Sequence, residues 1–142
     1  MTDYLVDLRR LPPTPSLPPN NAVYGTQPAS RYLDLEYFVG QCFYASWSQE
    51  LRLAHFRGTC RVLTVQDVVV GFACFDATFT GAFGPFGIHP RERKQKLGAL
   101  LLLNVLQEMR YRDHRYAFIG DVGADVAGFY QRVLPGNCRE LS

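Results

Sequence analysis

Hydrophobic and polar positions change their spacing several times along the first half of the chain. Residues 4–9 alternate between apolar and polar faces, which predicts a short strand. Six prolines within residues 12–28 predict an extended surface segment, because proline lacks an N–H donor and fixes φ. From Ser30 to about Phe56 the apolar side chains recur at helical spacing and predict two consecutive helices.

The middle of the chain is rich in β-branched and aromatic residues. Residues 60–66 and 68–76 flank a Gln66-Asp67 turn, and we expect them to form a hairpin. Residues 81–90 continue as another strand. Because Pro85 offers no N–H to a neighbouring strand, a bulge or a splay is expected beside it.

The last third begins with the clearest helix, residues 97–109, which contain no glycine or proline after Gly98. Residues 116–122 are almost entirely apolar, as expected for a central parallel strand. Residues 125–133 predict a short helix, and residues 137–142 leave room for one short strand. The whole chain, 1–142, is expected to form a single domain.

The segment from Phe86 to Ala99 carries the strongest chemical signal. A strand ends at Pro90, a basic turn follows, and a helix opens at Gly98-Ala99. The start of a helix leaves about four backbone N–H groups without helical partners, and the helix dipole adds positive potential there. The turn adds the charges of Arg91, Arg93, Lys94 and Lys96. This combination predicts an anion site, most naturally for phosphate.

These residues resemble the GNAT superfamily of acetyl-CoA-dependent N-acetyltransferases. Ile88-His89-Pro90 corresponds to the V-x-P of that family, and residues 93–98 correspond to its [QR]-x-x-G-x-[GA] loop. Lys96 stands where the family has the first glycine of the loop. Lysine can still adopt the conformation of a first helical turn, and its ammonium can pair with phosphate. The alternative is that its side chain weakens or displaces the bound cofactor.

The resemblance implies a mixed α/β fold with a mostly antiparallel central sheet that splays between its fourth and fifth strands. The family usually adds two strands after the last helix, whereas residues 137–142 allow only about one. An open sheet edge exposes unpaired backbone groups. We therefore expect either the proline-rich segment or a second subunit to cover the edge, and we predict a homodimer.

The same resemblance assigns a cofactor, acetyl-CoA, and the residues that bind it. Backbone groups of the fourth strand would pair with the pantetheine amides and the thioester carbonyl, and the loop would bind the pyrophosphate. The residues expected to contact acetyl-CoA are Phe86, Gly87, Ile88, Arg93, Lys94, Gln95, Lys96, Leu97, Gly98 and Ala99.

Two residues are candidates for catalysis. Tyr130 matches the family's tyrosine that protonates the departing CoA sulfur, and a phenol is a suitable acid for a thiolate. Asp121, at the end of the fifth strand, is a candidate base if burial raises its pKa. His89 and Asp76 are weaker candidates for the base, and a chain of water molecules is the remaining alternative. His114 is expected at the surface.

Composition favours an ordinary soluble domain over a nucleic-acid-binding, metal-binding or membrane-spanning protein. A content of 47% hydrophobic and 20% charged residues is ordinary for a soluble domain, and a net charge of +2 argues against nucleic-acid binding. Four cysteines without a C-x-x-C pair predict no metal site and a reduced, cytoplasmic protein. The longest apolar run is far shorter than the ~20 residues of a membrane span.

The sequence therefore predicts transfer of an acetyl group from acetyl-CoA to a primary amine of a small molecule or a peptide, by direct attack in a ternary complex. The alternative is a domain of the same fold that binds CoA and regulates, with little or no turnover. The substitution at Lys96 and the absence of an obvious base favour this alternative.

Overall fold

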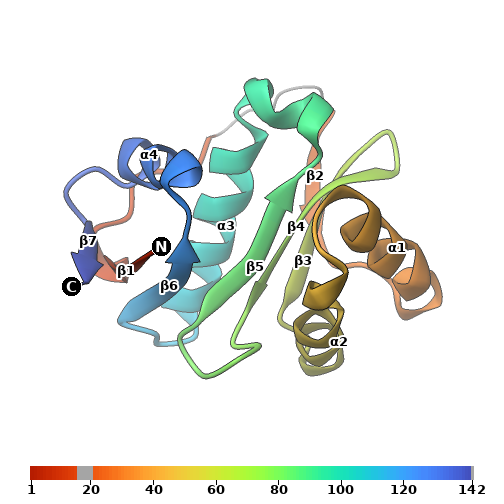
Figure 1. The fold of residues 1–142 in the computed structure, drawn as a ribbon, viewed down its shortest axis with the longest axis horizontal. Helices are drawn as coiled ribbons and strands as arrows, with labels where there is room; N and C mark the ends of the chain where they lie inside the picture. Colours follow the sequence, from red (N-terminus) through yellow and green to blue (C-terminus); the bar gives the residue numbers. More distant parts are fainter. Residues whose placement is uncertain (16–20, 142) are drawn as a thin grey trace.

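The computed structural model describes residues 1–15 and 21–141, without the side chains of residues 94 and 95. These residues form four α-helices and seven strands (Figure 1). The helices are α1 (Tyr32–Cys42), α2 (Ser48–Arg57), α3 (Leu97–Tyr111) and α4 (Ala124–Val133). The strands are β1 (Thr2–Asp7), β2 (Val23–Gly25), β3 (Cys60–Val65), β4 (Val68–Phe75), β5 (Phe83–Ile88), β6 (Tyr116–Val122) and β7 (Cys138–Leu141).

The strands form two antiparallel sheets, in the orders β2-β3-β4-β5 and β6-β1-β7. They meet at a parallel bridge between Ala82 and Phe118, where the Phe118 N–H donates to the Gly81 carbonyl at 2.8 Å. Beyond that bridge β5 and β6 diverge (Figure 1). The predicted GNAT-type mixed sheet with a splay between these two strands is confirmed.

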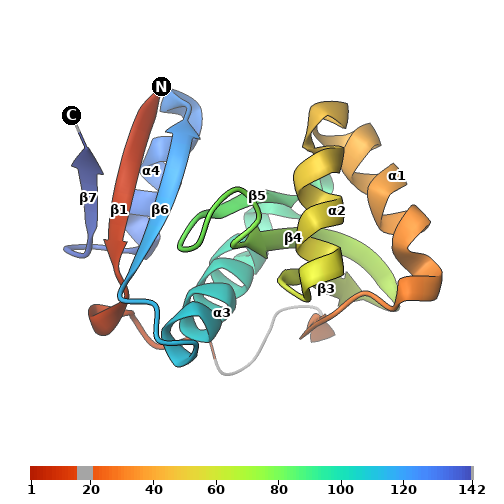
Figure 2. The same cartoon turned by 90° about the horizontal axis from the view of Figure 1, so that it is seen from below.

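Helices cover both faces of the four-stranded sheet. Helix α3 packs on one face, within a core that it shares with β1, β6 and α4. Helices α1 and α2 pack on the other face against alternate residues of β3 and β4 (Figure 2). The alternation arises because successive side chains of a strand point to opposite faces.

The N-terminal strand occupies a place that the sequence analysis did not foresee. β1 lies between β6 and β7, with Val6 opposite Ala117 on one side and Cys138 on the other. Tyr4 and Val6 are buried toward α3 and α4, and Figure 2 shows α4 on that face of the sheet. The strand expected to be missing after the last helix is thus supplied by the start of the chain, and β7 becomes the outer strand.

Two further expectations need correction. β2, within the segment expected to be extended surface, pairs with β3, and its neighbours Ala22 and Gln27 are buried. Residues 16–20 of that segment lie outside the described residues. β6 was expected to be a parallel strand, but its ladder is antiparallel to β1, and its only described parallel pairing is the bridge to Ala82.

An ion pair ties the four-stranded sheet to α3. The Arg61 guanidinium donates to both carboxylate oxygens of Glu108 at 2.7 Å, and the Tyr24 hydroxyl donates to the same carboxylate. Burial alone would raise the pKa of Glu108, but the hydrogen bonds from Arg61 and Tyr24 outweigh it and lower the pKa below its usual value. The pair therefore stays ionised inside the fold.

No described helix combines the length and the apolar character needed to cross a membrane. Within the described residues, no three His, Cys, Asp or Glu side chains gather as metal ligands.

Candidate functional site

The gap between β5 and β6 exposes backbone groups of β5. The His89 N–H donates to the Val70 carbonyl at 2.7 Å, so alternate residues of β5 bond to β4. By this alternation Gly87 faces β4, whereas the backbone groups of Phe86 and Ile88 face away from it. The Ile88 carbonyl accepts a hydrogen bond from Arg93 Nε at 3.1 Å, in agreement with this direction. The Phe86 N–H, the Phe86 carbonyl and the Ile88 N–H thus line the gap.

The start of α3 lies beside this strand end. A 3₁₀ turn (Pro90–Gln95) leads into it, and Lys96 precedes the helix with φ +62°. Lys96 is therefore left-handed, a conformation that favours glycine, and not in the helical conformation that a lysine can also adopt. The Lys96 side chain makes no capping hydrogen bond to α3, and Arg91, Arg93 and Lys96 are exposed around the first N–H groups of the helix. This arrangement is suited to binding an anion.

Aromatic rings from α4 close one side of the site. A Cβ atom on Gly98 would lie 3.1 Å from the Phe129 ring, and the Phe129 ring stacks on Phe86 at 6.0 Å between centroids. The start of α3, the Ile88 side chain of β5 and the Phe129 ring of α4 therefore meet at Gly98, where any side chain would press against the Phe129 ring.

Tyr130 is placed next to this aromatic pair. Its ring centroid lies 6.4 Å from that of Phe86 and 5.3 Å from that of Phe129, and the residue is only 6% exposed. Burial raises the pKa of Tyr130 well above that of a free phenol. The structure thus places Tyr130 beside Phe86 of β5, where burial keeps its hydroxyl protonated at neutral pH.

Asp121 lies at the end of β6, with its own N–H donating to Asp3 Oδ1 at 2.9 Å. The residue is exposed and left-handed, with φ +55°. The burial expected to raise its pKa is absent. Among the described residues, no hydrogen bond or ion pair engages its carboxylate.

The two weaker candidates for the base are occupied by structural contacts. His89 Nδ1 accepts the Arg91 N–H at 3.1 Å, and its ring stacks on Phe38. Asp76 bonds to His114 Nε2 at 2.9 Å and to the Gly81 N–H at 2.7 Å, near the start of β5 and the C-terminal end of α3, away from the helix start. His114 was expected at the surface, but its side chain is only 12% exposed.

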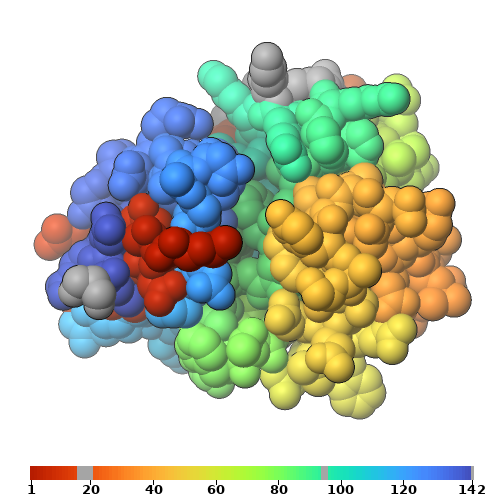
Figure 3. Space-filling model, in the orientation of Figure 1, coloured from red at the N-terminus to blue at the C-terminus, as the bar shows by residue number. Residues whose placement is uncertain are grey.

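A groove runs between the β1–β6 side of the molecule and the α1–α2 side, with β5 visible in its floor (Figure 3).

The α1–α2 side of this groove carries aromatic residues that the sequence did not reveal as part of the site. A Cβ atom on Gly87 would lie 2.5 Å from the Phe43 ring, so this ring lies directly on β5. The Phe43 ring stacks on Trp47 at 5.8 Å, and Tyr44 contacts Trp47 edge-on at 5.0 Å.

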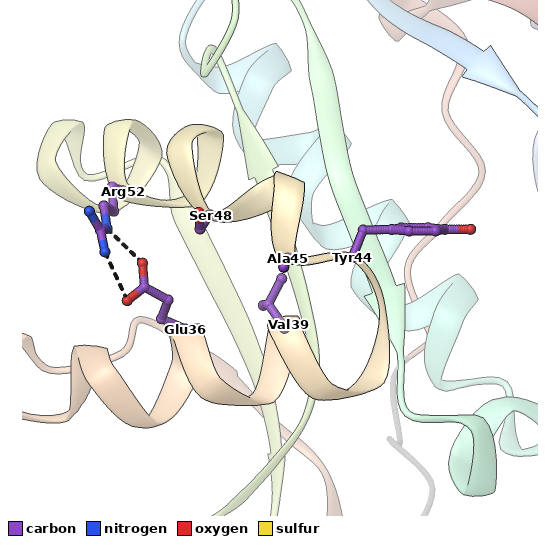
Figure 4. Close-up of a pocket in the computed structure, with 7 residues that line it drawn as sticks. Glu36, Val39, Tyr44, Ala45, Ser48 and Arg52 are labelled. Carbon is purple, nitrogen blue, oxygen red and sulfur yellow. Dashed lines mark hydrogen bonds and ion pairs between the residues drawn. The ribbon is translucent and has the colours of Figure 1, made fainter.

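A small pocket of about 180 Å³ opens between α1 and α2 (Figure 4). Glu36 and Arg52 lie at one end, joined by hydrogen bonds of 2.6 and 3.2 Å. Tyr44 is at the other end, and its ring points out of the pocket. The remaining lining residues are Val39, Gly40, Ala45 and Ser48.

The sequence profile of the acetyltransferase (GNAT) family matches residues 26–134 of this chain. The chain belongs to the GNAT family. Solved structures agree with that assignment at the level of fold. A GCN5-related glucosamine N-acetyltransferase region of a fungal multi-domain GH3 beta-N-acetylglucosaminidase superposes with a TM-score of 0.74 and 13% identity, over 99% of this chain and 19% of that one.

Two bacterial GNAT structures are also similar. A GCN5-related N-acetyltransferase from Sphaerobacter thermophilus has a TM-score of 0.68 and 17% identity, covering 93% of this chain and 47% of its own. A GNAT acetyltransferase from Brucella melitensis, in complex with acetyl-CoA, has a TM-score of 0.64 and 13% identity, covering 87% and 88%. This GNAT domain thus spans about half or less of the first two structures. No protein with a curated description is significantly similar in sequence.

Proposed function

We propose that this GNAT domain is an acetyl-CoA-dependent N-acetyltransferase whose cofactor lies in the gap between β5 and β6. The observation that carries the proposal is the junction at Gly98, where the first turn of α3 contacts Ile88, a residue of β5 whose backbone groups face away from β4. The residues present fit the cofactor, because this junction joins an anion site to a strand with open hydrogen-bonding groups.

The proposal gives each residue of the candidate site a role. The N–H groups of Leu97, Gly98 and Ala99, with Arg93 and Lys96, bind the pyrophosphate. Backbone groups of Phe86 and Ile88 orient the pantetheine arm. The bound cofactor supplies an activated acetyl thioester. Tyr130, which burial keeps protonated at neutral pH, is the proton donor to the departing sulfur, and Asp121 at the solvent-exposed end of β6 accepts a proton from the amine of a small molecule or a peptide.

Calorimetry with CoA and acetyl-CoA, followed by a thiol-release assay with a panel of amines, tests this function. We expect both cofactors to bind at micromolar to millimolar concentration and thiol release to require an amine. No binding of either cofactor at millimolar concentration would remove the proposal.

The second candidate function is a regulatory domain that binds CoA without turnover. The enclosure of Tyr130, at 6% exposure, favours it, because a proton donor must reach the sulfur. Binding of CoA with no thiol release from any amine, in wild type and in Tyr130→Phe alike, would support this alternative.

The proposal extends to assembly and location. We infer a homodimer that pairs through β7, since this outer strand of four residues offers one open edge. A species of 16.1 kDa in sedimentation at micromolar concentration would contradict the dimer. All four cysteines are free thiols, which supports a reducing, cytoplasmic location.

A further inference from the structure

The α1–α2 side of the groove is aromatic where it meets β5. The absence of a side chain at Gly87 lets the Phe43 ring lie on β5, beside the two residues whose backbone is proposed to hold the pantetheine arm. Any acceptor that approaches the thioester along this side therefore passes over Phe43.

Tyr44 extends the aromatic surface outward. Phe43 and Trp47 are half-buried and stack on each other, whereas Tyr44 is 62% exposed. The Tyr44 ring points away from the Glu36–Arg52 end of the adjacent pocket (Figure 4). Its contact with Trp47 fixes one edge of the ring and leaves much of the remainder accessible. An exposed tyrosine supported in this way offers a flat surface at low entropic cost.

The charges nearby do not favour a polycationic acceptor. Glu36 is the acidic residue of the pocket lining, and both of its carboxylate oxygens are bonded to Arg52. The same hydrogen bonds lower the pKa of Glu36, so the pair stays ionised and mutually neutralised. The lining thus presents mainly apolar and aromatic surface to a ligand.

We propose that the acceptor is a primary amine that carries an aromatic ring, and that this ring stacks on Tyr44 while the amine reaches the thioester beside Phe43. This inference rests on the proposed function. In the reaction, the ammonium first loses a proton to solvent or to Asp121. The amine nitrogen then bonds to the acetyl carbon, the carbon–sulfur bond breaks, and the sulfur leaves as a thiol with the proton from Tyr130. The remaining amine proton passes to solvent, and Tyr130 is reprotonated from it.

The test compares kcat/KM for phenethylamine, n-butylamine and spermidine. We expect wild type to prefer phenethylamine over n-butylamine by about fivefold or more, the scale of one aromatic pair. Tyr44→Ala should bring that ratio close to one, through KM, while Tyr44→Phe should retain it. Tyr37→Ala is the matched control, because Tyr37 is 70% exposed on α1 and has no described aromatic contact. That variant should keep the wild-type ratio.

Affinity for CoA separates this inference from the proposed function. Calorimetry should give the same Kd for CoA with wild type and Tyr44→Ala. Equal kcat/KM for phenethylamine and n-butylamine, or a preference for spermidine, overturns the inference and leaves the acetyltransferase intact. If no amine is acetylated, the proposed function fails, and calorimetry with the amines decides the inference. Phenethylamine binding that Tyr44→Ala weakens supports an aromatic site, and equal binding of phenethylamine and n-butylamine overturns it.

Discussion

Lys96 shows how one residue can keep the geometry of a glycine position. Its φ of +62° provides the turn that leads from Pro90–Gln95 into α3, although it carries a Cβ atom. A left-handed conformation costs a residue with a side chain roughly 1–2 kcal/mol. The left-handed turn therefore lowers the stability of the fold, and it places the exposed ammonium of Lys96 beside the candidate anion site.

Lys96→Gly should be more stable than Lys96→Ala by about 1 kcal/mol, because both lose the ammonium but only glycine relieves the left-handed strain. Urea denaturation of the two variants measures the difference. Alanine at least as stable as glycine would show that the turn carries no strain at residue 96.

At this scale, the sequence could predict only those site residues that belong to a local pattern. Gly98 and the basic turn lie within one short segment, and their arrangement follows from the strand, the turn and the helix start. The contact of Phe43 with Gly87 joins residues far apart in sequence, and no local spacing marks it. The burial of Tyr130 and the exposure of Asp121 depend on tertiary packing in the same way.

Among elements, the ion pair between β3 and α3 couples the sheet to the helix that begins the candidate site. Arg61 is 8% exposed and donates to Glu108 through Nε and Nη2, while its Nη1 donates to the carbonyls of Gly58 and Cys60. Removing one partner of such a pair leaves the other charge poorly compensated, which is the costly event.

Glu108→Gln should lower the free energy of unfolding at pH 7 by about 2–3 kcal/mol. This is less than the roughly 3–5 kcal/mol of a fully buried pair, because the Glu108 side chain is 27% exposed. The folded-state pKa of Glu108 lies below 4.5, so its contribution is complete above pH 4.5 and is lost as pH falls through the lower folded value.

Thermal denaturation between pH 7 and pH 3 measures this effect. The acid limb of Glu108→Gln should be shallower than that of wild type. The control is Glu140→Gln, which removes an exposed carboxylate on β7 and should leave the limb unchanged. Parallel pH curves for wild type and Glu108→Gln would contradict the assignment.

Most elements could be predicted because their patterns are strong and local. The hairpin of β3 and β4, helix α3 and helix α4 have clear periodicity or turn residues, and Gln66 and Asp67 adopt the positive φ of such a turn. β2 was missed because three residues after a run of prolines carry no readable alternation. The pairing partners of β1 were missed because alternation identifies a strand but not its neighbours.

At the scale of the whole molecule, the second sheet (β6-β1-β7) cannot form without β1, its central strand. It pairs with β6 and β7, and its inner residues join the same core as α3 and α4. β6 and β7 are not neighbours in this sheet, so each depends on β1 for its ladder. Asp3 of β1 also holds the end of β6 in place, because its carboxylate accepts the N–H of Asp121.

Val6→Asp should prevent folding, because Val6 is fully buried. The free energy needed to bury an unpaired charge exceeds the free energy of unfolding of most domains. Leu5→Asp is the matched variant on the opposite face of β1, where the residue is only half-buried, and should cost about 1 kcal/mol. Circular dichroism and urea denaturation of both variants measure the contrast. A folded Val6→Asp protein would show that β1 is dispensable.

The position of β1 also sets an order of events during synthesis. β1 is synthesised well before its two partners, Tyr116–Val122 and Cys138–Leu141. Translation at about 5–20 residues per second separates the first strand from β6 by roughly 5–20 s. During that interval the four-stranded half can collapse around α1 and α2 alone. β1 can form its ladders only after β6 and β7 have been synthesised, so the second sheet forms last.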